Sequence, residues 1–569
     1  MAGRWTTVKR SVWLAVVLLS GGGPDVAGGQ PTPHVAMQRL EDGRWRATWE
    51  LAEPAPVLRF DRPAQFYREH VWTIVTEGYR FGRTRGWQVL EVEPGATPRA
   101  TITVEFPEYT QHIPKEYELF QPFGDGAVAL YTGHFYASPR GAGVTDSTVI
   151  RTIRLTPPPG ARAIVRGEIR EGPFDWSDAI GDGTYVYLGT TDPIETEDLV
   201  AIVDAHVPAW LGEEMYRRLP ELFAAYARRL EASLPWKPLV FYSFDAAEAP
   251  GLSSSGGTLT GLIQMTLSGT GWLEQSPGAT EHALQFLAHE AAHLWNGQLV
   301  TSAGGGASWM HEGAADAMAR DLLLAFGVID LDGHRAGREA ALNQCFTALA
   351  LGDGPIATAH ERGAFRLFYD CGEVMALWTD AALRRVNADA DLFTFWRDLI
   401  HAARAGGGTY DVGMYFRVLA DRGVPRRTRE TMGAFLSARP AVEIGLQGLR
   451  AAGIDVRPGD GTPPPTVGQE LVRRVVMHLM RTACGRVSFW AGDPMVTAAI
   501  PDCAPFATEH RVHAIQGERV GGDAGALYDA VAAACRGGSP VRLEALDGSV
   551  LADVVCSAAL PDRPPWYVL

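Results

Sequence analysis

The sequence predicts a multidomain α+β protein in which a β-rich part precedes a largely helical part. Its 569 residues exceed the size of one typical domain. Residues 99–106, 126–131 and 163–166 are alternating or apolar runs, and turn-forming clusters such as the prolines at 157–159 separate them, which is typical of strands. From about residue 192 the apolar positions recur with helical spacing, for instance at 213–234. Strands followed by helices favour the α+β class.

The first 28 residues have the composition of a secretory signal peptide. Arg4, Lys9 and Arg10 form a basic start, an apolar run follows from Val12 to Leu19, and small residues precede a cleavage position near Gly28. An uncleaved anchor is the alternative, although the run is short for crossing a bilayer. The rest of the sequence has no apolar run of membrane-spanning length. We therefore expect export to a periplasm or to the exterior, with no integral membrane segment besides the signal.

Three segments and a linker are expected after the signal. Residues 29–191 are predicted to form a β-sandwich-like domain, and residues 192–455 a larger domain that carries the motifs described below. Residues 456–469 are rich in Pro and Gly and indicate a linker. Residues 470–569 contain short strand-like and helix-like runs and are expected to form a small α+β module. The net charge of −15 disfavours a nucleic-acid partner.

Six cysteines fit an oxidising compartment. None lies in the metal motif described next. Our hypothesis is that Cys345 pairs with Cys371. The four cysteines of the last segment allow three pairings, among which the sequence does not choose; sequential pairing is our working guess, joining Cys484 to Cys503 and Cys535 to Cys556.

The run from His289 to His293 contains the parts of a hydrolytic zinc site. On a helix, positions i and i+4 share one face, so both histidines can bind one metal ion. Glu290 is rotated by about 100° from His289 and can reach a water molecule without binding the metal. Glu312, eighteen residues after the motif, can supply the third ligand from a second helix. Three protein ligands and a water are typical of a catalytic zinc, one Zn²⁺ per chain.

The histidine pair and the nearby Asp316 each have a simpler explanation that does not involve a metal ion. His289 and His293 can instead be hydrogen-bonded core histidines, because their flanks are apolar. A buried pair of histidines with a glutamate needs several polar partners, however, and one metal ion satisfies them together. Asp316 lies one turn after Glu312 and can accept the free ring N–H of a ligating histidine. The alternative is that Asp316 only caps or solvates its helix.

The spacing of these residues resembles the aminopeptidase N family of gluzincin metallopeptidases. In that family the third ligand lies in a Trp-x-x-Glu-Gly-x-Ala context, which matches residues 309–315, and the Trp-Asn-Gly at 295–297 is similar to that family and to glycyl aminopeptidases. The resemblance implies a thermolysin-like gluzincin catalytic domain. It assigns zinc binding to His289, His293 and Glu312 and the general base to Glu290. The family often has Asn where this chain has His311, although adjacent helix positions point apart.

The resemblance extends to two further segments. Tyr369 takes the position of a family tyrosine whose phenol donates to the oxyanion of the tetrahedral intermediate; by itself it would be an ordinary core tyrosine. The family's Gly-x-Met-Glu-Asn strand corresponds to residues 255–265, where the glycines are kept and the acidic residue is missing. The implied substrate-binding residues, which would pair with a peptide backbone, are Gly256, Gly257, Thr258 and Leu259. Glu248 and Glu281 are candidates for the missing carboxylate.

Together these patterns predict an exported zinc metallopeptidase, a hydrolase that acts on peptides or proteins and is aminopeptidase-like. A zinc endopeptidase is one alternative. The other is a non-catalytic periplasmic binding or scaffold protein with a vestigial metal site, against which the intact Glu290 argues. The order of elements in residues 470–569 resembles the second half of a PDZ domain, a module that glycyl aminopeptidases also carry.

Overall fold

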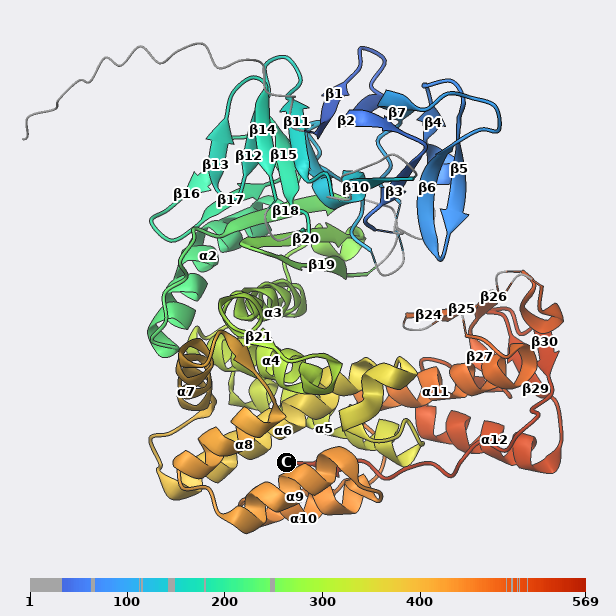
Figure 1. The fold of residues 1–569 in the computed structure, drawn as a ribbon. Helices are drawn as coiled ribbons and strands as arrows, with labels where there is room; N and C mark the ends of the chain where they lie inside the picture. The colour runs from blue at the N-terminus through green and yellow to red at the C-terminus, as the bar shows by residue number, and fades with distance from the viewer. Residues whose placement is uncertain are drawn as a thin grey trace, which may run out of the picture. The chain divides into compact units, whose positions relative to one another are not determined.

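The computed structural model describes residues 33–62, 67–111, 113, 116–141, 149–178, 181–245, 251–487, 489–492, 495–498, 500, 502–508 and 510–569. The expected signal peptide and Glu248 lie outside these residues. The described chain is mixed α+β, with a β-rich amino-terminal part and a helical part after it, as predicted (Figure 1). It divides into two compact units. The first contains the described residues up to Pro107, with Phe135–Leu155 and Asp175–Ser177; the second contains Glu108–His134, Thr156–Phe174 and Asp178–Leu569.

Two sheets build the first unit. Buried and less buried side chains alternate along Val57–Phe60 and the first half of Trp45–Ala55. Aromatic rings of the two sheets meet, since Trp49 lies 5.8 Å from Phe60 between ring centroids, and Trp72, just after a short helix, lies 6.3 Å from Trp49. A short helix, α1 (Arg68–Val71), accompanies the sheets. The six-stranded sheet has the order β14 (Phe174–Ser177), β11 (Thr152–Thr156), β1 (His34–Arg39), β2 (Trp45–Ala55), β7 (Arg99–Phe106), β4 (Thr73–Ile74), and the four-stranded sheet β10 (Ala137–Arg140), β3 (Val57–Phe60), β6 (Trp87–Val92), β5 (Tyr79–Thr84).

The second unit begins with two five-stranded sheets. In the second of them, β17 (Val200–Val203), β18 (Leu239–Asp245) and β20 (Leu262–Ser268) run parallel, and β19 (Ser253–Leu259) pairs antiparallel with β20 at the edge. Helix α2 (Ala209–Arg229) connects β17 to β18. It overlaps the helix that the sequence predicts at 213–234. The first sheet has the order β13 (Glu168–Arg170), β12 (Arg162–Val165), β15 (Tyr185–Gly189), β9 (Val128–Tyr131), β8 (Phe120–Pro122), and the second β16 (Ile194–Glu195), β17 (Val200–Val203), β18 (Leu239–Asp245), β20 (Leu262–Ser268), β19 (Ser253–Leu259).

The helical part of the second unit starts with α3 (Pro277–His293), which carries the metal motif and lies beside β19 (Figure 1). The Ser276 side chain caps α3 by accepting from the Ala279 N–H, and Pro277 occupies the first turn, where its missing N–H costs nothing. A π-helical turn, Leu294–Leu299, ends it. The following helices are α4 (Ser308–Ala325), α5 (Leu331–Ala350), α6 (Arg366–Val386), α7 (Leu392–Ala405), α8 (Val412–Asp421), α9 (Arg426–Ser437) and α10 (Ala441–Ala451).

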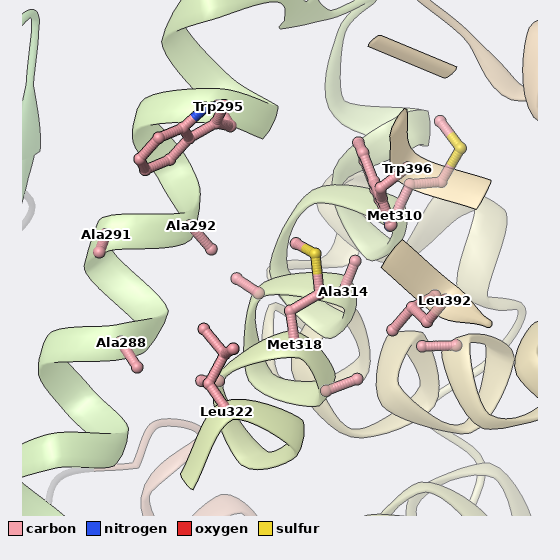
Figure 2. Close-up of a cluster of buried hydrophobic side chains, with 14 of the residues drawn as sticks. Ala288, Ala291, Ala292, Trp295, Met310, Ala314, Met318, Leu322, Leu392 and Trp396 are labelled. Carbon is pink, nitrogen blue, oxygen red and sulfur yellow. The ribbon is translucent and has the colours of Figure 1, made fainter. Parts of the chain in front are cut away.

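Small residues let the helices around the motif approach closely. Ala288 and Ala292 of α3 lie opposite Met318 and Leu322 of α4 in the apolar core of this unit (Figure 2). Helices α4 and α6 meet through two glycines: a Cβ added to Gly313 would lie 2.0 Å from the Gly372 carbonyl carbon, and one added to Gly372 would lie 2.2 Å from the Trp309 carbonyl oxygen. The small residues of α4 therefore allow α6 to pack closely against it. The Cys345–Cys371 disulfide ties α5 to α6.

The last part of the chain contains two helices and two small sheets. The disulfides Cys484–Cys503 and Cys535–Cys556 have the sequential pairing that we hypothesised. The elements are α11 (Pro465–Cys484), a sheet of β24 (Phe489–Gly492), β25 (Met495–Ala498) and β26 (His510–Val512), helix α12 (Ala524–Gly537), and a sheet in the order β28 (Glu518–Arg519), β27 (Ala514–Ile515), β29 (Val541–Glu544), β30 (Val550–Val554).

This part is attached to the helical core at both of its ends. At its start, Arg474 of α11 pairs with Asp353 (2.7 Å) and with Glu470 (2.7 Å). At its end, β31 (Tyr567–Val568) pairs with β23 (Arg457–Pro458), which lies within the predicted linker. The buried Asn343 of α5 donates to the Tyr567 carbonyl (2.8 Å) and accepts from the Tyr567 N–H (2.7 Å). In the described part of the chain, no helix is both long and apolar enough to cross a membrane.

Candidate metal centre and the adjoining cleft

Helices α3 and α4 bring the three predicted metal ligands together. The Nε2 atoms of His289 and His293 lie 3.0 Å apart, and the Glu312 Oε2 lies 3.4 Å from the first and 3.2 Å from the second. A tetrahedral zinc with bonds of about 2.0–2.2 Å places its donor atoms about 3.3–3.6 Å apart, and the three distances lie within about 0.3 Å of that range. The Glu312 Oε2 is buried and accepts no hydrogen bond within the described residues. A metal ion would satisfy it, so the donor set and its spacing fit Zn²⁺.

Each histidine is oriented by a partner on its other ring nitrogen. Asp316 Oδ1 lies 2.8 Å from the His289 Nδ1, and Asn296 Oδ1 lies 3.0 Å from the His293 Nδ1. With both Nδ1–H groups donating, both Nε2 lone pairs face Glu312, as metal binding requires. Asp316 was expected here from its place one turn after Glu312. Asn296 was not expected, because it lies in the π-helical turn after α3. Such a turn contains more residues than an α-helical turn, so α-helical spacing does not predict which side chains face the metal ligands there.

His311 also contacts the site, although it precedes Glu312 in the chain. Its ring stacks on that of His293, with centroids 4.1 Å apart and planes 14° from parallel. Gly297 makes room for it, because a Cβ there would lie 2.4 Å from the His311 Cε1. The expectation that adjacent helix positions point apart therefore misses this ring, which reaches back from the first turn of α4. Burial lowers the pKa of His311 to about 4, so its ring is neutral beside the metal ligands.

The electrostatics separate the roles of the two glutamates. Burial raises the pKa of Glu290, and its Oε2 has no hydrogen-bond partner within the described chain. Burial also raises the pKa of Glu312, but the imidazoles of His289 and His293 overcome this and hold the pKa well below its usual value. Glu312 is thus a permanent anion, whereas Glu290 is a buried carboxylate that gains from accepting a proton.

Tyr369 lies on α6 at the rim of the site. Its ring stacks on His289 at 5.8 Å between centroids, and 39% of the residue remains exposed. Burial and the negative charge of Glu312 raise the pKa of Tyr369, so the phenol keeps its proton and can donate it in a hydrogen bond. The contact of Gly313 with Gly372 sets how close Tyr369 comes to α4, because all of these residues lie within one turn of each other on the two helices.

A cleft of about 680 Å³ opens beside the metal ligands. The amino-terminal half of α3 forms one wall and the edge strand β19 another, and a hydrogen bond between the Ser254 Oγ and the His282 Nε2 (2.8 Å) joins the two walls. His289, Glu290, Asp316 and Tyr369 line one end of it. The other lining residues are Ser254, Ser255, Gly256, Gly278, Glu281, His282, Gln285 and Phe286.

Of the four predicted substrate-binding residues, Gly256 is the one that the structure places in the lining of the cleft. The run at 255–265 is a hairpin, which turns at Gly261 with φ 71°. Gly256 lines the cleft, whereas Gly257 does not. The Thr258 carbonyl accepts from the Tyr117 hydroxyl (3.1 Å), and Leu259 is buried with its carbonyl accepting from the Gln298 side chain (2.6 Å). Ser254 and Ser255, one step earlier on the same strand, take the place in the cleft that we had expected for Thr258 and Leu259.

Comparison with known proteins gives a likeness of fold. No protein-family model and no curated protein matches the sequence. The structure of an aminopeptidase N family protein from Idiomarina loihiensis is similar over 94% of this chain and 97% of its own, with a TM-score of 0.59 and 12% identity. An M1 zinc metallopeptidase from Deinococcus radiodurans with bound Tyr-Ser-Ala covers 72% of this chain and 93% of its own (TM-score 0.39, 14% identity). Yeast LTA4 hydrolase covers 80% and 72% (TM-score 0.42, 10% identity). The first of these shows that the chain shares the fold of that protein.

Proposed function

We propose that this protein is an exported zinc metallopeptidase that cleaves peptide bonds and is aminopeptidase-like. The observation that carries the proposal is the triangle of His289 Nε2, His293 Nε2 and Glu312 Oε2 at the end of an open cleft, with Glu290 buried beside it. The fold shared with an aminopeptidase N family protein supports it. Export rests on the signal-like first 28 residues and on the disulfides.

The residues of the site suit the steps of peptide hydrolysis. His289, His293 and Glu312 would hold Zn²⁺, which when bound activates water and polarises a carbonyl group. Glu290 takes the proton of the attacking water, which its raised pKa favours, and passes it to the leaving amine. Tyr369 donates its phenolic hydrogen to the oxygen of the tetrahedral intermediate. Asp316 and Asn296 hold the two imidazoles in the tautomer that binds metal.

Zinc analysis and activity of a Glu290→Gln variant test the catalytic proposal. The variant keeps the size of the side chain and removes the base, so we expect zinc to stay bound and peptide hydrolysis to fall by about 10²- to 10⁴-fold. Full hydrolysis by this variant with zinc bound would remove Glu290 from the mechanism. A wild-type protein that binds zinc and cleaves no peptide of a diverse library would favour the vestigial site instead.

Blocking the amino terminus of the substrate separates the two peptidase alternatives. An aminopeptidase requires a free α-amino group, so acetylated peptides should resist cleavage, whereas an endopeptidase should cleave both forms. The strand at 253–259 lacks the acidic residue that the resemblance would place there, and the edge of β19 remains available to an extended peptide at Ser254, Ser255 and Gly256. Mass spectrometry of the products locates the cleaved bond in either case.

A further inference from the structure

The lining of the cleft carries a surplus of negative charge. It contains Glu281, Glu290 and Asp316, and none of its described lining residues is Lys or Arg. Glu290 and Asp316 act on the metal site, and Asp316 accepts from His289. Glu281 has no hydrogen bond or ion pair within the described chain. Its charge acts on Arg320, but the Arg320 Nε donates to Glu373 (2.9 Å). Glu281 is therefore a partly buried carboxylate without a direct partner, in a site that a ligand can enter.

The distance of Glu281 from the metal ligands decides which part of a peptide it can meet. Glu281 lies eight residues before His289 on α3, so their Cα atoms are about 12 Å apart along the helix axis. Helical side chains lean towards the amino terminus, which does not shorten this distance. In a substrate, the α-amino nitrogen lies only about 2.5 Å from the carbonyl carbon of the same residue. Glu281 is thus too far away to hold the amino group of the residue whose carbonyl is attacked.

An extended peptide spans the gap in a few residues. At about 3.3–3.6 Å per residue, 12 Å corresponds to three or four residues. Gln285 lies halfway along the same wall. Its Nε2 donates to the Asp316 carbonyl (3.2 Å), whereas its Oε1 is buried without a hydrogen-bond partner among the described residues. An N–H of a peptide that follows this wall would satisfy that acceptor.

We propose that Glu281 is a specificity-determining residue that pairs with a cationic group of the substrate about three residues from the cleaved bond. The group is the ammonium or guanidinium of Lys or Arg, or the free amino terminus of a peptide cut at about its third bond. The inference rests on the proposed function, since it names the substrate class for the same cleft. It also makes the single-residue amino-terminal anchor that the resemblance suggested for Glu281 incompatible with the geometry.

A mixture of random decapeptides, digested by the wild-type protein and by Glu281→Gln, tests the pairing. We expect Lys and Arg to be enriched about tenfold at one position two to four residues from the cut, because a charge-assisted hydrogen bond is worth about that factor. The enrichment should disappear in Glu281→Gln. It should remain in the control Glu274→Gln, which removes the same charge from an exposed residue that does not line the cleft. Acetylation of the library distinguishes the two sources: a preference for Lys and Arg side chains should survive it. If the cation is instead the free amino terminus, the unmodified peptides should be cut at about their third bond without Lys or Arg enrichment, and acetylation should abolish that cut.

Peptide binding without cleavage keeps the two hypotheses separate. In the Glu290→Gln background, the Kd of a fluorescent peptide with Lys at the preferred position is compared with the Kd of the same peptide with norleucine in place of that Lys. If no preferred position is known, Lys is placed at each position in turn. About tenfold tighter binding of the Lys peptide, lost on adding Glu281→Gln, supports the inference even if the wild-type protein cleaves nothing. Equal affinities at every position that acetylation of the peptide also leaves unchanged, no binding at all, or a preference that survives Glu281→Gln would overturn it, whether or not hydrolysis is observed.

Discussion

Replacing Gly313 by alanine should separate the two helices on which the proposed catalytic groups lie. The added Cβ would lie 2.0 Å from the Gly372 carbonyl carbon, whereas carbon atoms in contact lie about 3.5 Å or more apart. Relief requires α4 and α6 to move apart by about 1.5 Å. Glu312 lies next to Gly313 on α4, and Tyr369 lies about one turn before Gly372 on α6, so both side chains would move with the contact. Because a displacement of about 1 Å can cost about 10²-fold in rate, we expect kcat/KM for a peptide to fall at least that far.

The same variant should lose stability by about 1–3 kcal/mol, the usual cost of an added methyl group in a packed contact. Gly212→Ala on α2 is the matched control, since its Cβ would meet nothing within 4 Å. That variant should keep its activity and be equally or slightly more stable, because alanine favours a helix by up to about 1 kcal/mol over glycine. Peptidase kinetics, bound zinc and thermal unfolding measure the difference. If Gly313→Ala matched Gly212→Ala in all three, the glycine contact would not position the site.

Three further predictions concern the surroundings of the metal ligands. Tyr369→Phe removes the proposed oxyanion donor and should lower kcat by about 10²-fold with little change in KM; an unchanged kcat would exclude that role. Burial lowers the pKa of His289, but the charge of Asp316 and its hydrogen bond outweigh this and raise the pKa well above its ordinary value, which favours the protonated ring in the absence of metal. Calorimetry in two buffers should therefore find protons released on zinc binding, zinc affinity that falls with falling pH, and fewer released protons in Asp316→Asn. His311→Ala removes the ring stacked on His293 and should weaken zinc binding by about 10-fold, which His311→Phe restores; equal zinc retention by both variants would argue against a positioning role.

Much of the metal centre could be predicted because its ligands follow helix geometry. His289, His293, Glu312 and Asp316 are one turn apart in pairs, and the structure brings all four together. Asn296 and His311 could not be predicted in the same way. The first depends on a π-helical turn, and the second on the space that a glycine leaves in that turn. The Trp-Asn-Gly run at 295–297 was a signal for both, since a glycine there makes close approach of another side chain possible.

The predicted substrate-binding strand is the part of the site for which the sequence pattern was least accurate. The apolar and small residues at 255–265 predicted one strand, but Gly261 with its positive φ folds them into two. The part facing the cleft consequently shifts towards Ser254, which bonds to His282. The helix predicted at 213–234 is α2 (Ala209–Arg229), which begins four residues earlier and ends five residues earlier. The domain boundaries that we expect from composition stay predictions.

The attachment of the chain's last residues has a topological consequence. Because β31 pairs with β23, the residues between them form a loop whose two ends meet, as in an inserted domain. Removal of the strand at Tyr567 would therefore act on α5 rather than on the neighbouring sheets. Asn343, which is only 2% exposed, would lose both of its bonds to Tyr567 inside the helical core. A carboxy-terminal truncation or fusion at this end of the protein would thus perturb the part of the fold that carries the candidate metal centre.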